Sequence, residues 1–339
     1  MNRDCVLEVR NLRTHFRLDE GMLKAVDGVT LNIREKTTVG IIGESGCGKS
    51  VTAQSILRIV PPPGRIVGGE IWLHRGSKAP LDLTTLDSNG TEIRSIRGKE
   101  ISMVFQEPMT SLSPVHTVGA QIAEVVQLHT TNNKREAEEI ALDMIARVGI
   151  SNPAQRFREY PHQLSGGMRQ RAMIAMALAC NPRVLIADEP TTALDVTVQA
   201  QILDLMQHLQ EQFGMAIMYI THNLGVIAEI ANEVNVMYLG RVVERARTAE
   251  LFRNPLHPYT QRLLKSIPKV GRKARTRLDA IKGNVPIPLD PPRECGFYSR
   301  CNEAMVGKCN LAVPALVDMG DEHYVRCFLH AEEQEVAHA

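Results

Sequence analysis

The feature that most limits the possible folds is the glycine-rich segment Gly43–Ser50, which reads GESGCGKS. It matches the pattern G-x-x-x-x-G-K-[ST], and it stands between a strand-like apolar run and a helix-like run. Glycines let backbone N–H groups surround phosphate oxygens, and the helix start adds a favourable dipole. The segment therefore predicts a phosphate-binding loop, with Lys49 reaching the β- and γ-phosphates and the Ser50 hydroxyl binding Mg²⁺. A glycine-rich turn that matches by chance is the alternative, and the flanking runs disfavour it.

The periodicity of the apolar residues predicts the fold around this loop. Residues 5–42 contain β-rich runs, and residues 117–160 place apolar residues at helical spacing. Further along, strand-like and helix-like runs alternate, with an amphipathic helix expected near 196–213, a second helix near 223–231 and strands near 234–245. This alternation predicts an α/β fold with a largely parallel sheet and helices on both faces.

Two segments beside these runs have more specific expectations. The loop is expected to open a helix that runs to about Val60 and stops at the sequence PPPG. Short β-like pieces with glycines over 65–105 predict a small antiparallel subdomain.

Polar residues follow three of the apolar strands. Asp188 and Glu189 lie near the end of the run VLIADEP. The Asp188 carboxylate suits a Mg²⁺ ligand, and the neighbouring Glu189 can deprotonate an attacking water. His222 follows the next strand, where it can contact the γ-phosphate, and Gln106 follows a shorter run, where its amide can sense Mg²⁺ or water. Each has an ordinary structural alternative, namely a strand-end cap, a hydrogen-bonding histidine or a loop glutamine.

A second glycine-containing helix start occurs at Leu164–Arg171, which reads LSGGMRQR. Together with Gly43–Ser50, Gln106, VLIADEP, TTALD and His222, in that order, it resembles the nucleotide-binding subunit of ATP-binding cassette (ABC) transporters. The resemblance covers residues 5–250 and implies a P-loop NTPase fold with a RecA-like core, an antiparallel β subdomain and an α-helical signature subdomain. It also implies ATP hydrolysis with Mg²⁺, held by Ser50, Gln106 and Asp188.

The resemblance also implies a head-to-tail pair of cassettes. The signature residues of one chain would bind the γ-phosphate held by the other chain's loop, and Asp195 in TTALD would lie at the contact, besides capping a helix. Phe16 is expected to stack on adenine, with His15 as a weaker candidate. The expected nucleotide contacts are Gly43, Glu44, Ser45, Gly46, Cys47, Gly48, Lys49, Ser50 and Val51. The expected signature contacts are Leu164, Ser165, Gly166, Gly167 and Met168.

Two stretches point to a subgroup of the family. Gln106–Ile122 and Asn254–Pro268 resemble importers of dipeptides and oligopeptides, with nickel importers among their relatives. The first would receive a coupling helix of the membrane subunit. A polar loop and a proline-capped surface helix are the plain alternatives. The resemblance implies as partners a second cassette, identical or homologous, two transmembrane permease subunits and an extracytoplasmic solute-binding protein.

Proline-rich sequence marks a boundary near residue 250, so we expect an ATP-binding domain over 1–250, with its helical subdomain at about 117–180, and an extension over 251–339. Four of the seven cysteines lie in that extension, and four thiols can hold zinc or a [4Fe–4S] cluster. Cys-x2-Cys pairs typical of zinc ribbons are missing, and members of the subgroup have similar cysteines as iron–sulfur ligands, so a cluster is expected before zinc. Thiols without metal remain an alternative, and His323 and His330 are substitute ligands. The four cysteines are Cys295, Cys301, Cys309 and Cys327.

Composition and the lengths of the apolar runs bear on the class of partner. The 39 Lys+Arg and 38 Asp+Glu among 339 residues give a formal charge of +1, which does not favour nucleic-acid binding. The N-terminal residues alternate like a strand, and no apolar run approaches the roughly 20 residues of a membrane span. We therefore expect a cytosolic chain, and the family resemblance implies a peripheral position on the cytoplasmic face of the inner membrane.

Two rival functions remain from the sequence. A soluble cassette ATPase of DNA repair or translation usually has two cassettes or a long coiled-coil insertion, and this chain has neither. A binding module whose cysteine-rich extension senses redox state is the second rival.

Overall fold

The computed structural model describes residues 4–76, 78–107, 111–192, 194–266, 281 and 283–330. The chain forms two compact units, and both are assembled from separated segments. The first unit comprises Ile33–Thr38, Leu73–Ile220 and the N-terminal residues to Leu7. The second comprises Glu8–Asn32, Val39–Trp72 and the residues from Thr221 onward.

The first unit contains three parallel strands in the order β6 (Ile101–Val104), β7 (Val184–Asp188) and β8 (Ala216–Ile220). All residues of β7 and β8 are buried, as the apolar sequence of a strand covered on both faces predicts. The amphipathic helix α8 (Val196–Phe213) connects β7 to β8. In the register of this pair Asp188 lies opposite Ile220, so both strands end at the same edge.

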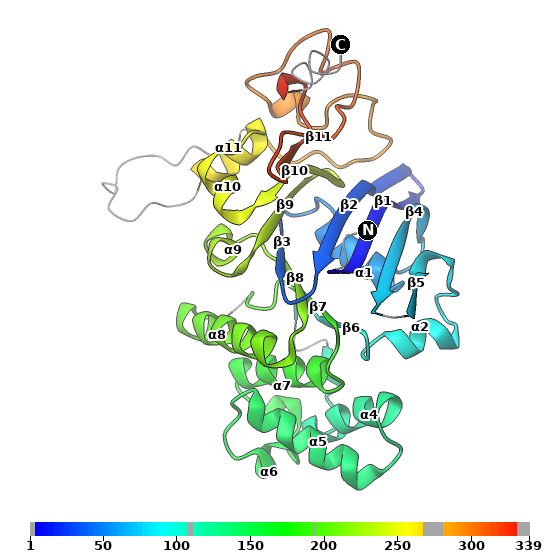
Figure 1. Ribbon diagram of the computed structural model, residues 1–339, viewed down its shortest axis with the longest axis vertical. Coiled ribbons are helices and arrows are strands. Elements are labelled where there is room, and N and C mark those ends of the chain that lie inside the picture. Colours follow the sequence, from blue (N-terminus) through cyan, green and yellow to red (C-terminus); the bar gives the residue numbers. More distant parts are fainter. Residues whose placement is uncertain are drawn as a thin grey trace. The chain divides into compact units, whose positions relative to one another are not determined.

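A helical group follows β6 in the first unit, coloured green to teal in Figure 1. It consists of α4 (Val118–His129), α5 (Lys134–Arg147), the short α6 (Pro153–Arg156) and α7 (Gly166–Leu178). On α4 the buried residues Val118, Ile122 and Val126 repeat every four positions, which gives the helix one apolar face. Among the described residues, this unit also contains β5 (Lys78–Asp82), the 3-10 turns Leu83–Thr85 and Pro161–Gln163, and α2 (Thr91–Ile96).

The second unit contains most of the long strands β1 (Cys5–Leu18), β2 (Gly21–Arg34) and β4 (Gly64–Arg75), which lie side by side in the order β2-β1-β4. Their ends extend into the first unit. Only two residues join β1 to β2, which a hairpin allows and a parallel crossover does not.

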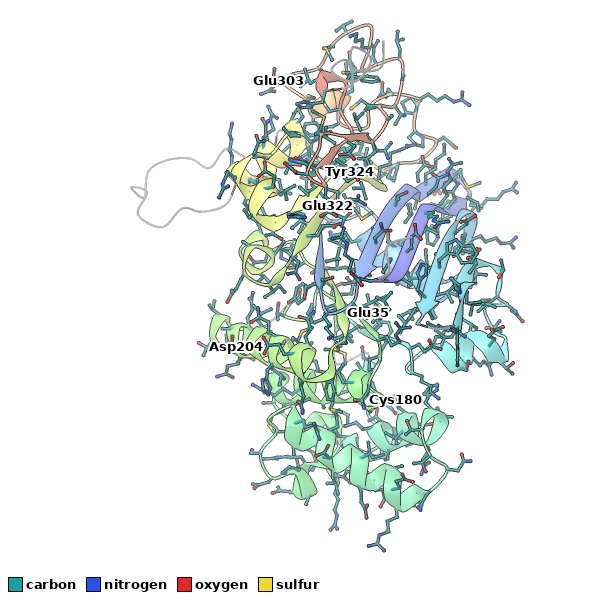
Figure 2. All side chains as sticks on the ribbon, in the orientation of Figure 1. Glu35, Cys180, Asp204, Glu303, Glu322 and Tyr324 are labelled. Carbon is teal, nitrogen blue, oxygen red and sulfur yellow. The ribbon has the colours of Figure 1, made fainter. Side chains whose placement is uncertain are left out.

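The C-terminal residues extend a second sheet of this unit. Its order is β11 (Val317–Asp318), β12 (Tyr324–Val325), β10 (Arg241–Arg247), β9 (Glu233–Tyr238) and β3 (Thr38–Ile42). Only the β3–β9 pair is parallel. Tyr324, labelled in Figure 2, lies under the Arg245 guanidinium at 4.1 Å from the ring centre. The helices of the second unit are α1 (Lys49–Ile56), α9 (Leu224–Ile230), α10 (Thr248–Arg253), α11 (Pro258–Lys265) and the 3-10 turn η3 (Tyr298–Arg300).

Two local predictions were wrong. The helix α1 ends at Ile56 and not at Val60, because Arg58 takes a left-handed φ of 58° and the Ile59 N–H returns to the Gln54 carbonyl at 2.9 Å. Together with the bond from the Arg58 N–H to the Ser55 carbonyl at 3.0 Å, this bond forms a Schellman motif, which closes the helix before the prolines.

The region 65–105 is not an antiparallel subdomain throughout. It contains the helix α2, and β6 pairs in parallel with β7.

The predicted helix at 196–213 is confirmed as α8. In the part of the chain that the structure describes, no helix combines the length and apolar character needed to cross a membrane.

Candidate functional site

The glycine-rich loop connects β3 to α1 in the second unit. Gly43 has a φ of 153°, and a Cβ there would lie 2.3 Å from the Met237 carbonyl oxygen. Gly48 has a φ of 99°, and its Cβ would lie 2.2 Å from the Ala25 carbonyl oxygen. Only glycine fits both positions, so neighbouring backbone shapes the loop.

The loop presents its amides at the start of α1. Gly48 is the N-cap and supplies no side-chain acceptor to the first N–H groups of the helix. Such amides are suited to an anion. The buried Lys49 ammonium donates to the carbonyls of Gly43 at 2.9 Å and Glu44 at 3.2 Å, which holds it against the loop.

Cys47 is fully buried beside this lysine, and burial raises the pKa of its thiol. It therefore contributes packing to the loop. Ser50 and Val51 follow in the first turn of α1, both partly exposed.

The predicted adenine contacts lie on β1. Phe16 is partly buried, and its ring lies 2.5 Å from where a Gly64 Cβ would be. His15, the preceding residue, lines a hollow with Arg17 and Pro62. Burial lowers the pKa of His15, and its Nε2 lies 3.7 Å from Asp27 Oδ1.

The first unit brings Gln106 and Glu189 together. The Gln106 amide donates to Glu189 Oε2 at 3.3 Å, and the Thr192 hydroxyl donates to the same oxygen at 2.9 Å. Glu189 has a left-handed φ of 46°, and its own N–H bonds to the Ile220 carbonyl at 2.9 Å. A non-glycine residue in this conformation is strained, and such strain concentrates at functional sites. Asp188, one residue earlier, is 5% exposed at the end of β7.

The signature segment begins α7 in the first unit. Ser165 is the N-cap, and its hydroxyl accepts a bond from the Met168 N–H at 3.4 Å. Ser165 and Gly166 are exposed, and a Cβ on Gly166 would meet no atom within 4 Å, so the start of this helix is open. Leu164 is buried, whereas a Cβ on Gly167 would meet Val198 at 3.0 Å.

Asp195 and His222 occupy helix starts. Asp195 accepts a bond from the Val198 N–H at 2.9 Å, which confirms its role as the N-cap of α8. His222 is exposed just before Asn223, the N-cap of α9. His222 and the phosphate-binding loop belong to the second unit, and Gln106, Glu189 and the signature belong to the first. Residues 108–110 of the expected coupling stretch lie outside the described residues, and so does residue 193 of the TTALD segment.

The four cysteines of the extension are free thiols, of which Cys309 and Cys327 are buried. Burial and then the charges of neighbouring thiols raise the pKa of Cys295 to about 11 and that of Cys327 to about 12. The Cys295 N–H donates to the Cys309 carbonyl at 2.8 Å. Even so, no group of three or more His, Cys, Asp or Glu side chains in the described ranges is arranged to hold a metal ion.

The two histidines considered as substitute ligands have other contacts. His323 Nε2 lies 2.8 Å from Glu244 Oε1, and His330 Nε2 lies 3.2 Å from the Leu256 carbonyl oxygen.

Sequence analysis missed a contact that ends on the phosphate-binding loop. Arg300, between Cys295 and Cys301, forms two hydrogen bonds with the Glu44 carboxylate. Glu44 occupies a variable position of the loop pattern and Arg300 matches no motif, so the sequence contains no signal for a contact between them.

Comparison with known proteins places this geometry among transporter ATPases. Residues 26–192 match the family described as "ABC transporter", and residues 243–309 match "Oligopeptide/dipeptide transporter, C-terminal region". The oligopeptide transport ATP-binding protein AppD of Bacillus subtilis is 50% identical over 97% of this chain and 98% of its own length. The dipeptide transport ATP-binding protein DppD of the same organism is 44% identical over 98% and 97%.

Solved structures agree. The ATP-binding cassette MJ0796, in a dimeric post-hydrolysis state bound to ADP and Pi, superposes with a TM-score of 0.62 and 27% identity, over 71% of this chain and 98% of that one. The cassette cbiO1 from Clostridium perfringens gives a TM-score of 0.60 and 26% identity, over 74% and 92%.

Proposed function

This chain belongs to the ABC transporter family, and we propose that it is the subunit whose ATP hydrolysis powers the import of di- and oligopeptides through a membrane transporter. The observation that supports this most is the similarity to oligopeptide and dipeptide transport ATP-binding proteins along nearly the whole chain, extension included. The chain is an ABC-type ATPase, and its fold is that of the family's nucleotide-binding domain. Nickel import and the soluble ATPases are not favoured by these relatives.

The loop residues 43–51 are proposed to bind the phosphates, with Phe16 against adenine. The backbone amides and Lys49 would bind the β- and γ-phosphate oxygens, because they concentrate donors and positive charge at one place. Ser50, Gln106 and Asp188 offer the oxygen ligands that Mg²⁺ prefers, and the buried Asp188 carboxylate fits a cation. The ion would neutralise charge on the phosphates.

Glu189 is proposed as the base that takes the proton of the attacking water. Gln106 and Thr192 orient its Oε2 by the hydrogen bonds described above. His222 is proposed to contact the γ-phosphate. The open start of α7, Leu164–Met168, is proposed to bind the γ-phosphate held by a second cassette, with Asp195 at the contact between the two.

An importer ATPase needs permease subunits, so we propose that residues 106–122 receive a permease helix at the cytoplasmic face of the inner membrane. The other proposed partners are a second cassette, two permeases and an extracytoplasmic binding protein. The proposed domains are 1–250, with the helical group at about 117–180, and 251–339.

The test is the substitution Glu189→Gln in the assembled transporter. We expect peptide-stimulated ATP hydrolysis to fall by about 10²–10⁴-fold, because the amide cannot accept the proton, while ATP binding is retained. Glu211→Gln, at an exposed position of α8, is the matched control. If the second cassette of the transporter has no active site of its own and Glu189→Gln still hydrolyses ATP at the wild-type rate, Glu189 is not the base. Stimulation by nickel and not by peptides would refute the peptide specificity.

The extension is further proposed to hold a [4Fe–4S] cluster, with zinc as the alternative. Four thiols are the usual ligand set for such clusters. Burial, and then the charges of neighbouring thiols, raise the pKa of Cys295 and of Cys327, and a bound cationic centre would favour their thiolate forms. The ligands would be Cys295, Cys301, Cys309 and Cys327, and the cluster would stabilise a segment with few regular elements.

Anaerobic purification with iron, acid-labile sulfide and zinc assays tests this proposal. We expect about four iron and four sulfide per chain, and their loss in Cys327→Ser. Cys180→Ser, outside the extension, is the control and should keep the metal (Figure 2). One zinc without sulfide would establish the alternative, and protein without metal would contradict both.

A further inference from the structure

Glu44, the second residue of the phosphate-binding loop, is held by residues of the C-terminal extension. The Arg300 guanidinium donates from Nη1 to Glu44 Oε2 at 2.7 Å and from Nη2 to Oε1 at 3.1 Å. Two parallel N–H···O bonds fix the orientation of the carboxylate as well as its position. The Arg300 side chain is 5% exposed and that of Glu44 is 26% exposed, so solvent screens this pair only partly.

Arg300 is itself held in place by the second unit. Its Nη1 lies 3.2 Å from the Tyr238 hydroxyl, and its Nη2 donates to the Gly283 carbonyl at 3.0 Å. Its own carbonyl accepts a bond from Arg262 of α11 at 3.1 Å. The guanidinium is therefore preorganised towards Glu44.

The backbone of Glu44 is tied to the same part of the protein. Its N–H donates to the Tyr259 hydroxyl at 3.0 Å. Tyr259 is fully buried on α11, and its ring packs against Tyr238 and Phe297 with centre distances of 4.7 and 5.4 Å. The three packed aromatic rings of Tyr238, Tyr259 and Phe297 thus support this end of the loop through the Tyr259 hydroxyl.

Glu44 in turn shapes the part of the loop that faces phosphate. Its carbonyl oxygen accepts bonds from the Lys49 ammonium at 3.2 Å and from the Cys47 N–H at 3.3 Å. A shift of Glu44 would therefore move the lysine and the turn that follows. In addition, an unpaired Glu44 carboxylate would place a negative charge beside a site for a polyanion.

Arg300 is also close in sequence to the cysteines. It ends the 3-10 turn η3, and the next residue, Cys301, donates its N–H to the Tyr298 carbonyl at 3.2 Å. Cys295 accepts at its carbonyl from the Tyr298 N–H at 2.8 Å. The turn that presents Arg300 is thus bounded by two of the four cysteines.

We propose that Arg300 is a positioning residue of the nucleotide site, which holds the phosphate-binding loop through Glu44 and cancels its charge, so that the cysteine-bearing extension sets the affinity for ATP. This inference rests on the proposed function of the loop. Arg300 touches no reacting atom in this scheme, and it acts through Glu44.

The test is a double-mutant cycle read by ATP binding to the full chain and by KM and kcat of the assembled transporter. In Arg300→Met we expect the Kd and KM for ATP to rise about tenfold and kcat to change less than about twofold, because removal of one partner leaves a carboxylate without its counter-charge. Adding Glu44→Gln to Arg300→Met should recover at least about threefold of that loss, because the repelling charge is gone. A merely structural role would not give this recovery.

Arg247→Met is the matched control, since it removes an ion pair with Glu322 elsewhere in the second unit, at 68% and 35% side-chain exposure. It should leave the Kd for ATP within about twofold of wild type. If Arg300→Met does not fold, Arg300→Lys replaces it, with a Kd about threefold higher, because one ammonium cannot make both bonds.

The outcomes distinguish the proposed function of the loop from the role of Arg300. A wild-type chain that does not bind ATP would overturn the proposed function. If the wild-type chain binds ATP and the Arg300 variant binds it with the same affinity, this inference alone is overturned. The same holds if the double variant shows no recovery of affinity.

Discussion

His257 is a residue whose protonation the fold opposes. Complete burial lowers its pKa to about 4, although Glu244 acts in the opposite direction. Its Nδ1 accepts the Tyr259 N–H at 3.0 Å as the N-cap of α11. Protonation of Nδ1 would remove this acceptor, so the native state requires that Nδ1 carries no proton.

This residue predicts a loss of stability in mild acid. The pKa of His257 is about 4 in the folded chain, and an unfolded chain has a value of about 6.5. As the pH falls from about 6.5 to 4, the unfolded state binds a proton that the native state does not. The free energy of unfolding should therefore fall by about 3 kcal/mol across this window and be fully retained above it.

Denaturant titrations between pH 7 and 4 measure this effect. His257→Asn keeps a capping acceptor without titrating, so it should show a smaller loss of stability in this window. His208→Asn, on the exposed face of α8, is the control for loss of a histidine. An acid dependence equal in wild type and His257→Asn would contradict the assignment.

At the residue scale, the sequence identified side chains that belong to a local pattern. Lys49, Asp188 and Glu189 follow strands in recognisable order, whereas the hydrogen bond between Gln106 and Glu189 is seen only in the structure. The pair of Arg300 and Glu44 was beyond reach, because 256 positions separate the two residues and no spacing rule connects them. Which residues bind nucleotide remains a prediction.

Among the elements, β10 joins the extension to the rest of the second unit by strand pairing. It pairs with β9 on one side and with β12 on the other. The Glu244 carboxylate on β10 is fully buried and accepts bonds from the N–H groups of Leu256 and His257 at 2.7 and 2.9 Å. His323 contacts it from the extension at 2.8 Å. One buried carboxyl group thus connects a strand, the start of α11 and the C-terminal segment.

Removal of this carboxylate should loosen the start of α11. In Glu244→Gln one of the two oxygens becomes an NH₂ group that cannot accept a bond, so at least one of the two N–H groups loses its acceptor. We expect hydrogen exchange at Leu256 and His257 to accelerate by about 10–100-fold. Amide exchange followed by mass spectrometry or NMR measures the change.

The control for this prediction is Glu250→Gln on α10, a neighbouring helix outside the Glu244 contacts. Exchange on α8 should stay unchanged in both variants, since α8 belongs to the other unit. Unaltered protection of Leu256 and His257 in Glu244→Gln would show that these amides do not depend on the carboxylate.

Elements with one strong period were predicted well. The amphipathic pattern of 196–213 is long and ends at Gly214, which takes a left-handed φ of 64° as a C-cap. Segment 65–105 was interpreted less well, because its short runs have no clear period and pairing partners decided their state. The partner of β6 is β7, which lies about 80 positions later in the chain. Only this pairing shows that β6 is a parallel strand.

At the scale of the whole molecule, chain order and compact units do not coincide. Both units contain segments from distant parts of the chain, and the second unites the phosphate-binding loop with the C-terminal extension. The boundary expected near 250 follows a change in composition. Contacts such as those of Glu44 and Glu244 join residues on its two sides.

The sequence by itself determined the family, the ATPase activity and the alternation of strands and helices from β7 to β10, because these depend on local patterns and motif spacing. Only the tertiary structure decided what holds the phosphate-binding loop from outside and which amides a buried carboxylate satisfies. The physical reason is that such contacts depend on side-chain geometry between segments far apart in the chain. Local propensity and periodicity contain no information about that geometry.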